Sequence, residues 1–146
     1  MLKQLTVFLE NTPGRLAEAT GVLADAAINL HALSIADTAD FGILRMIVSD
    51  PARAAAALKE KGLMVKTNNV IAVATGHTPG SLHKILKDLE LLGIAVEYLY
   101  AFASPIREYK ALVVLRLSDQ AVAMEKLRDS GFMVLGEDLL TQLNES

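Results

Sequence analysis

The stretch that decides the fold is Thr12-Pro13-Gly14, which recurs 66 residues later as Thr78-Pro79-Gly80. Each tripeptide follows a short run rich in apolar and β-branched residues and precedes an amphipathic segment. Matches in the same order along a chain are the signature of an internal duplication. The same offset pairs four apolar positions: Leu16 with Leu82, Leu23 with Leu89, Ile28 with Ile94, and Leu33 with Leu99.

Further along the chain the offset becomes 69 residues. Ser49-Asp50 then pairs with Ser118-Asp119, and Gly62-Leu63-Met64-Val65 pairs with Gly131-Phe132-Met133-Val134. The change of offset predicts a three-residue insertion between positions 104 and 109 of the second copy. We therefore expect two similar units, over residues 1–69 and 70–146.

Each copy has the pattern strand, helix, strand, strand, helix, strand. The first helix of each copy follows the i, i+3, i+4, i+7 spacing of one buried stripe, with Leu16, Ala19, Leu23, Ala26 and Ala27 in one copy and Leu82, Ile85, Leu86, Leu89 and Leu92 in the other. The predicted strands cover residues 5–9, 28–36, 42–48 and 63–66, then 70–75, 94–102, 110–117 and 132–135. This order predicts an α+β fold of two ferredoxin-like βαββαβ units, each an antiparallel sheet with its helices on one face.

The second helix of each copy has clear start and stop signals. Asp50 can cap its first turn, with Pro51 at the first helical position, and Asp119 takes the same place in the second copy. Gly62 and Gly131 stand where a helix ends in a left-handed residue.

Two of the predicted strands are apolar on both faces. In residues 43–48 and 112–117 both alternate sets are largely apolar, whereas an antiparallel sheet with one solvated face alternates apolar and polar residues. One interpretation is that these strands are central in one wide eight-stranded sheet. We favour a second chain that covers the sheet faces, and so we expect a homodimer.

Composition excludes several classes of function. The chain has 146 residues, 52% hydrophobic and 21% charged, with a net charge of −3 and no cysteine. It has no basic patch for nucleic acid, and residues 67–83, its longest stretch without a charged side chain, contain Gly and Pro, which predict no membrane-spanning helix. Without cysteine it has no disulfide, thiol nucleophile or thiolate metal site. We expect a cytoplasmic protein.

The turn over residues 10–16 joins a strand to the start of a helix. The N–H groups of Gly14, Arg15 and Leu16 are predicted to face outward at the positive end of the helix dipole, where a carboxylate or a phosphate can bind. The alternative is a plain Pro-Gly turn that only starts the helix.

The run Asn-Thr-Pro-Gly-Arg-Leu at 11–16, followed by Ala-Asp-Ala-Ala-Ile-Asn-Leu at 24–30, resembles the ACT domain, a module that binds amino acids in regulated metabolic enzymes and stand-alone regulators. The resemblance covers nearly the whole chain, which is similar to a tandem ACT protein with no catalytic domain. It implies that the ligand lies where the first loop of one unit meets the second strand of a neighbouring unit. Carried over by position, the implied ligand-binding residues are Asn11, Thr12, Pro13, Gly14, Arg15, Leu16, Ile28, Asn29 and Leu30, and in the second copy His77, Thr78, Pro79, Gly80, Ser81, Leu82, Ala95 and Val96.

The two copies differ at these positions. The second copy has Ala95 where the first has Asn29, a departure from the Ile-Asn pair usual in the family, and His77 in place of Asn11. The hypothesis is that the N–H groups at 14–16 or 80–82 bind the carboxylate of an amino acid, while backbone carbonyls near Asn29 or Ala95 accept from its ammonium group.

The leading prediction is a non-catalytic amino-acid sensor that regulates a metabolic enzyme partner or its own oligomeric state. No cofactor and no metal is expected, because His31, His77 and His83 do not form the i, i+4 pair of a helical metal site. The alternative is a small acylphosphatase-like hydrolase on the same chain plan, which needs an Arg in a phosphate loop directly after the first strand. Arg15 comes too late for that role. RNA binding through exposed aromatics is disfavoured by the 5% aromatic content.

Overall fold

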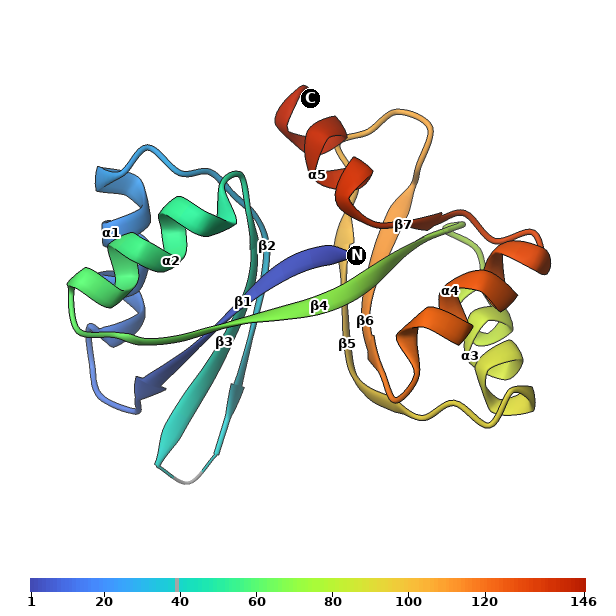
Figure 1. Ribbon diagram of the computed structural model, residues 1–146, viewed down its shortest axis with the longest axis horizontal. Helices are drawn as coiled ribbons and strands as arrows, with labels where there is room; N and C mark the ends of the chain where they lie inside the picture. Colours follow the sequence, from blue (N-terminus) through green and yellow to red (C-terminus); the bar gives the residue numbers. More distant parts are fainter. Residues whose placement is uncertain (39) are drawn as a thin grey trace. The chain divides into compact units, whose positions relative to one another are not determined.

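The computed structural model describes residues 1–38 and 40–146, and the chain divides into two compact units (Figure 1). We call Lys3–Asn68 the first unit, and Asn69–Ser146 together with Met1–Leu2 the second unit. The grouping of Met1 and Leu2 with the second unit was not predicted from the sequence. Each unit is an α+β structure with an antiparallel sheet, as the duplication predicts.

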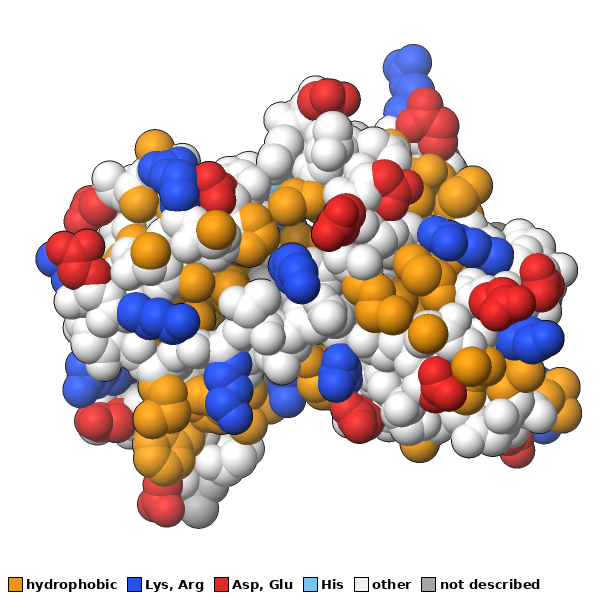
Figure 2. Space-filling model, in the orientation of Figure 1, with side chains coloured by type: hydrophobic (Ala, Val, Ile, Leu, Met, Phe, Trp, Pro, Cys, Tyr) orange, Lys and Arg blue, Asp and Glu red, His pale blue; other side chains and the backbone are white. Residues whose placement is uncertain are grey.

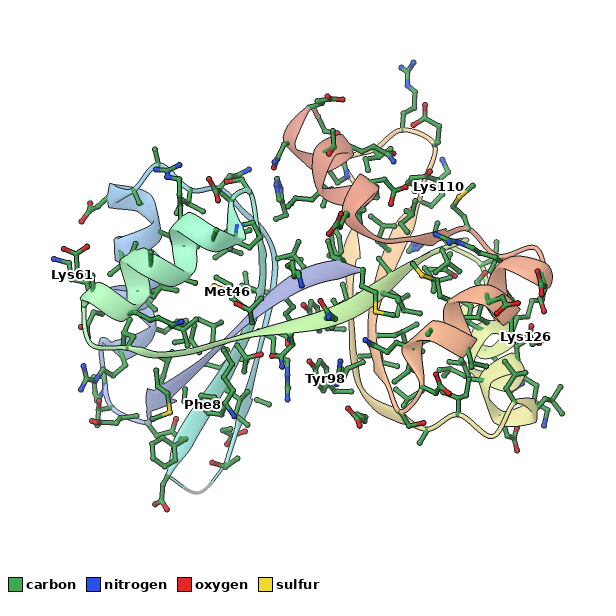
Figure 3. All side chains as sticks on the ribbon, viewed as in Figure 1. Phe8, Met46, Lys61, Tyr98, Lys110 and Lys126 are labelled. Atoms are coloured by element: carbon green, nitrogen blue, oxygen red, sulfur yellow. The ribbon has the colours of Figure 1, made fainter. Side chains whose placement is uncertain are left out.

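The first unit follows the predicted order of elements: β1 (Leu2–Glu10), α1 (Arg15–Asp25), β2 (Leu30–Asp37), β3 (Phe41–Val48), α2 (Pro51–Glu60) and the start of β4 (Met64–Thr75). Its strands lie in the order β2-β3-β1-β4, and both helices cover the same face of the sheet (Figure 1). Leu5, Val7 and Met46 from the sheet pack with Leu23 and Leu58 from the helices. Met46, labelled in Figure 3, lies in this core.

The second unit repeats this plan with one addition. The rest of β4 is followed by α3 (Ser81–Leu91), β5 (Val96–Ala103), β6 (Ala111–Leu117), α4 (Gln120–Asp129), β7 (Val134–Leu135) and α5 (Glu137–Asn144). The strand order is β7-β4-β6-β5. Ile71, Val113 and Leu115 of the sheet pack with Leu89 and Leu127 of the helices.

The predicted helix signals are confirmed. The Asp50 carboxylate accepts from the Arg53 N–H at 3.2 Å at the start of α2, and the Asp119 carboxylate accepts from the Val122 N–H at 3.2 Å at the start of α4. Gly62 and Gly131 end these helices with φ of +81° and +91°.

The ends of α1 and α3 differ in one residue. At corresponding positions Gly93 has a φ of +69° and Ala27 has a φ of +55°, a conformation that is uncommon for residues with a side chain. The hydrogen bonds that close the two helices are alike: the Ile28 N–H donates to the Leu23 carbonyl at 2.9 Å, and the Ile94 N–H to the Leu89 carbonyl at 3.0 Å.

The two strands predicted over 63–66 and 70–75 form one strand, β4. Asn68 and Asn69, which lie between the two predicted strands, are of a residue type that is depleted in strands. In the first unit the Thr6 hydroxyl donates to the Asn68 side-chain oxygen at 2.6 Å. In the second unit the Asn69 carbonyl accepts from Arg116 at 2.7 Å and from Gln120 at 2.8 Å. These long-range bonds hold the polar residues in strand geometry.

The C-terminal helix α5 was not predicted. Leu139 and Leu143, four residues apart, are buried, and Glu137 and Asp138 lie in its first turn, where the helix dipole favours acidic residues. The Asp138 carboxylate accepts from the Gly136 N–H at 2.9 Å. The strand predicted over residues 132–135 is shorter: β7 covers Val134 and Leu135, which pair with β4, and the Met133 carbonyl accepts from the Ala74 N–H of β4 at 2.9 Å.

The strands with two apolar faces are buried on both sets of alternating residues. Ile47 of β3 and Leu112 and Val114 of β6 lie outside the two cores described above, yet their exposed fractions in a single chain are 0%. These strands are therefore apolar and buried on both faces, as the residue pattern predicts, but the burial of these residues does not require the second chain that the sequence analysis favoured.

Candidate ligand-binding site

The turn between β1 and α1 is built around a glycine in a left-handed conformation. Gly14 has a φ of +88° directly before α1, and Gly80 has a φ of +86° directly before α3. No heavy atom lies within 4 Å of the place where a Cβ would stand at either glycine. The backbone conformation, rather than crowding, therefore favours glycine at both positions. The two copies share this turn geometry.

Some of the N–H groups predicted to bind a ligand already have an acceptor. The Arg15 N–H donates to the Thr12 carbonyl at 3.4 Å, and the Ser81 N–H donates to the Thr78 carbonyl at 3.2 Å. Leu16 and Leu82 lie in the first helical turn, whose N–H groups have no acceptor within the helix. A bound carboxylate would therefore accept mainly from the N–H groups of residues 14 and 16 in the first copy, or of residues 80 and 82 in the second.

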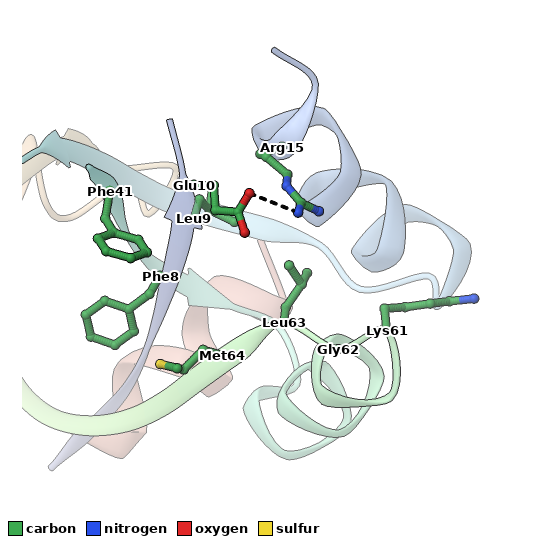
Figure 4. A pocket seen from close by; sticks show the side chains of 9 residues that line it. All are labelled: Phe8, Leu9, Glu10, Arg15, Phe41, Lys61, Gly62, Leu63 and Met64. Atoms are coloured by element: carbon green, nitrogen blue, oxygen red, sulfur yellow. Dashed lines mark hydrogen bonds and ion pairs between the residues drawn. The ribbon is translucent and has the colours of Figure 1, made fainter. Parts of the chain in front are cut away.

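Arg15 is held by two carboxylates. Its guanidinium donates to Glu18 at 2.9 Å and to Glu10 at 3.3 Å. These hydrogen bonds, first that to Glu18 and then that to Glu10, raise the pKa of the Arg15 guanidinium above its ordinary value. The side chain thus lies across the turn with a fixed direction, and its pair with Glu10 is visible in Figure 4.

A small cavity of about 130 Å³ lies where this turn meets the hairpin of β2 and β3. Asn11, Thr12 and Leu16 line it from the turn, and Ile35 and Gly42 from the hairpin. The Asn11 side-chain amide donates to the Thr38 carbonyl at 3.2 Å, which ties the turn to the hairpin. A Cβ on Gly42 would stand 3.3 Å from Ile35 Cδ1, so this glycine allows the two strands to meet closely beside the cavity.

The remaining predicted residues of the first copy lie at the other end of α1. Ile28 is buried, while Asn29 is exposed, and its backbone N–H and carbonyl bind Ser49 at 2.9 Å each. Since α1 has 11 residues and rises about 1.5 Å per residue, these residues lie about 16 Å along the helix from the turn. Within one unit the structure does not bring Asn11–Leu16 together with Asn29.

The second copy has the same arrangement with other side chains. His77 is exposed in its turn, and the hydroxyls of Thr78 and Ser81 share a hydrogen bond of 2.8 Å. The Ala95 N–H and carbonyl each bind Ser118 at 3.0 Å, as Asn29 binds Ser49. Again the turn and the start of the second strand lie at opposite ends of one helix, α3.

A larger cavity, of about 370 Å³, lies on the other side of the Glu10–Arg15 pair (Figure 4). Its lining consists of Phe8, Leu9, Phe41, Gly62, Leu63 and Met64, together with those two charged residues and a third, Lys61. None of these apolar residues was predicted as a site residue. The signal that could have found them is the difference between the copies, because Ala74 stands where the first copy has Phe8 and Lys110 where it has Phe41.

Among residues 1–38 and 40–146, no group of three or more His, Asp or Glu side chains is placed to hold a metal ion. Within the same residues, every helix is too short or too polar to cross a membrane.

The chain belongs to the ACT domain family: the model described as "ACT domain pair" matches residues 1–143. The crystal structure of protein BT0572 from Bacteroides thetaiotaomicron is similar to it, with 44% sequence identity and a TM-score of 0.88, covering 95% of this chain and 94% of that one. A search of curated proteins gives no significant match.

More distant structures share the fold. The regulatory subunit of aspartate kinase from Thermus thermophilus, in its ligand-free form, is 16% identical with a TM-score of 0.63, covering 87% of this chain and 91% of that one. The corresponding subunit from Thermus flavus is 16% identical with a TM-score of 0.59, covering 85% and 86%.

Proposed function

We propose that this chain is a non-catalytic regulatory protein that binds a free amino acid at the turns before α1 and α3. The observation that carries the proposal is the turn itself: in both copies a left-handed glycine precedes the open N-terminus of a helix. Such an end supplies N–H donors and positive potential to a carboxylate. Membership of the ACT family, and a fold shared with regulatory subunits of aspartate kinase, support a regulatory role.

We infer that the ligand lies between ACT units. The turn and the start of the following strand are at opposite ends of a helix within each unit, so a ligand that contacts both must bridge two units. The carbonyls of Asn29 and Ala95 already accept one hydrogen bond each, from Ser49 and Ser118. A ligand ammonium would therefore use the second lone pair of such a carbonyl, or the Asn29 side-chain amide in the first copy.

A second copy of this chain is part of the proposal. β2 is an edge strand of the first unit, and its Leu33 and Ile35 are 48% and 50% exposed. Leu33 pairs with Met46 and Ile35 pairs with Leu44, and these two β3 residues belong to the core between the sheet and the helices. Leu33 and Ile35 therefore lie on the same face of the sheet and extend its apolar surface beyond the helices. We expect light scattering to show a dimer at micromolar concentration, and a strict monomer would contradict this part of the proposal.

The acylphosphatase alternative is not retained. Its arginine must lie in a phosphate loop directly after the first strand, whereas Arg15 comes after the Pro-Gly turn and is the first residue of α1. The comparisons give no support to a hydrolase of this kind either.

Thermal melts of the intact chain with each of the twenty amino acids test the proposal. A ligand at a hundred times its Kd stabilises the folded state by about 2.7 kcal/mol, which is readily seen as a higher Tm. We expect a shift with a small subset of amino acids. No shift with any of them, together with turnover of an acyl phosphate, would contradict the proposal and restore the enzyme alternative.

Calorimetry on two variants tests which copy dominates. We expect Asn29→Ala to weaken binding more than His77→Ala, because the Asn29 amide can both donate to a carboxylate and accept from an ammonium. The reverse order would place the main site in the second copy. Gly14→Val and Gly80→Val, made separately, disturb the two turns without removing a side-chain contact.

A further inference from the structure

The larger cavity of the first unit has the size and lining of a small-molecule site. Its volume of about 370 Å³ falls in the range of roughly 300 to 1,000 Å³ typical of ligand pockets. Phe8, Phe41 and Met64 lie on one side of it, and Leu63 lies between them and Arg15 (Figure 4). Phe41 is 49% exposed and Met64 is 66% exposed. Figure 2 shows this apolar surface at the outer ends of β1 and β3.

The charged wall of this cavity carries both signs. Arg15 uses one terminal nitrogen for Glu18 and the other for Glu10, at 2.9 and 3.3 Å. A guanidinium has five N–H donors and a carboxylate has about four acceptor positions, so both Arg15 and Glu10 keep capacity for a ligand. Lys61 also lines the cavity, so its wall carries two cations beside the Glu10 carboxylate. A zwitterion, which brings an ammonium as well, is suited to the pair.

The second unit shows that the fold does not require this lining. Corresponding residues of β4, β6 and the turn before β7 enclose a cavity of about 410 Å³ there. Ala74 replaces Phe8, Gly76 replaces Glu10 and Lys110 replaces Phe41. The counterpart of Arg15 is Ser81. The Phe8 and Phe41 rings and the Glu10–Arg15 pair therefore have no counterparts at the corresponding positions of the second unit, whose cavity is lined by Tyr109 and Phe132 instead.

We propose that this cavity binds the side chain of a large apolar amino acid, aromatic by preference, with its carboxylate on Arg15 and its ammonium on Glu10. The proposal rests on the proposed function in that the ligand is a free amino acid, and for the first unit it assigns the carboxylate and the ammonium to Arg15 and Glu10 in place of the backbone partners given there. Flat side chains gain most from Phe8 and Phe41, since aromatic rings attract one another beyond the area that they bury. The Lys66 ammonium lies over the Phe8 ring, 5.9 Å from its centre, and Lys66 is not among the residues that line the cavity.

Calorimetry on the intact chain tests the ligand class. We expect phenylalanine to bind, and serine and aspartate to bind at least about tenfold more weakly. 3-Phenylpropionate lacks the ammonium and 2-phenylethylamine lacks the carboxylate, so each should also lose at least about tenfold. Binding of 3-phenylpropionate as tight as that of phenylalanine would overturn the role of Glu10.

Variants locate the site. Phe41→Ala should weaken phenylalanine binding by at least about tenfold, while the matched control Lys110→Ala should change it by less than about twofold. Phe41 is half exposed, so the variant keeps the core, which circular dichroism verifies. Glu10→Gln keeps the shape of the side chain and should abolish the preference for phenylalanine over 3-phenylpropionate.

The outcomes separate the two proposals. If a polar amino acid binds tightly and Phe41→Ala leaves it unaffected, this inference fails while the proposed function stands. If no amino acid binds, both fail. If Phe41→Ala converts a dimer into a monomer with unchanged affinity for phenylalanine, the apolar surface is an interface between copies and the inference is wrong.

Discussion

The two units share their backbone geometry and differ in their side chains. Gly14 and Gly80 have φ values of +88° and +86°, and the reciprocal bonds of Asn29 with Ser49 and of Ala95 with Ser118 differ by only 0.1 Å. The cavity beside the turn differs: Phe8, Phe41 and the Glu10–Arg15 pair line it in one unit, and Tyr109, Phe132 and Lys110 line it in the other. The two copies thus share the turn that we propose to bind a ligand and differ in the residues that we propose to select it.

The largest expected effect tests whether the two cores are equivalent. Leu23→Ala and Leu89→Ala each remove a side chain that is 1% exposed at corresponding positions of α1 and α3. Each should lower the free energy of unfolding by about 2 to 5 kcal/mol. Urea denaturation followed by circular dichroism measures both. A difference of more than about 2 kcal/mol between the variants would show that the shared backbone does not imply equal packing.

A smaller effect tests the caps of α2 and α4. Asp50→Ala and Asp119→Ala each remove a carboxylate that accepts from an N–H at 3.2 Å in the first helical turn. Each variant should lose about 1 kcal/mol of stability. Asp50 also lies 3.8 Å from the Arg53 guanidinium, so double variants with Arg53→Ala separate the cap from the ion pair. Once the contribution of the Asp50–Arg53 ion pair is subtracted, we expect Asp50→Ala and Asp119→Ala to lose equal amounts of stability.

The smallest effect concerns the residues that end α1 and α3. Ala27→Gly should raise the unfolding free energy by roughly 0.5 to 1 kcal/mol, because the left-handed conformation at φ +55° disfavours a Cβ. The matched change Gly93→Ala should lower it by a similar amount. Both residues are exposed, so thermal melts report the backbone effect with little change in packing. If Ala27→Gly lowered the stability instead, the left-handed conformation of Ala27 would not be strained.

The elements with local signals were predicted from the sequence. Asp50, Pro51 and Gly62 fix the limits of α2 through contacts within a few residues, and the repeat extends the same prediction to α4. The turn before α1 was also predicted, because proline and glycine restrict or widen the backbone choices at fixed positions. The ligand-binding roles of residues 11–16 and 28–30 stay predictions.

The features that the sequence analysis missed depend on distant partners. β4 passes through Asn68 and Asn69 because Thr6, Arg116 and Gln120 form hydrogen bonds with them, and these partners are 47 to 62 residues away. The apolar cavity was missed for a similar reason. Phe8 and Phe41 read as ordinary strand residues, and only the antiparallel pairing of β1 with β3 brings them together.

Ala27 also bears on the history of the duplication. A residue held at positive φ is tolerated only while the protein stays above the stability that its function requires. Stability above that threshold lets one copy accept substitutions that would unfold a marginally stable domain. The second unit has Gly93 at this position and does not carry the same cost, so the two copies differ in local backbone strain as well as in the residues that line their cavities.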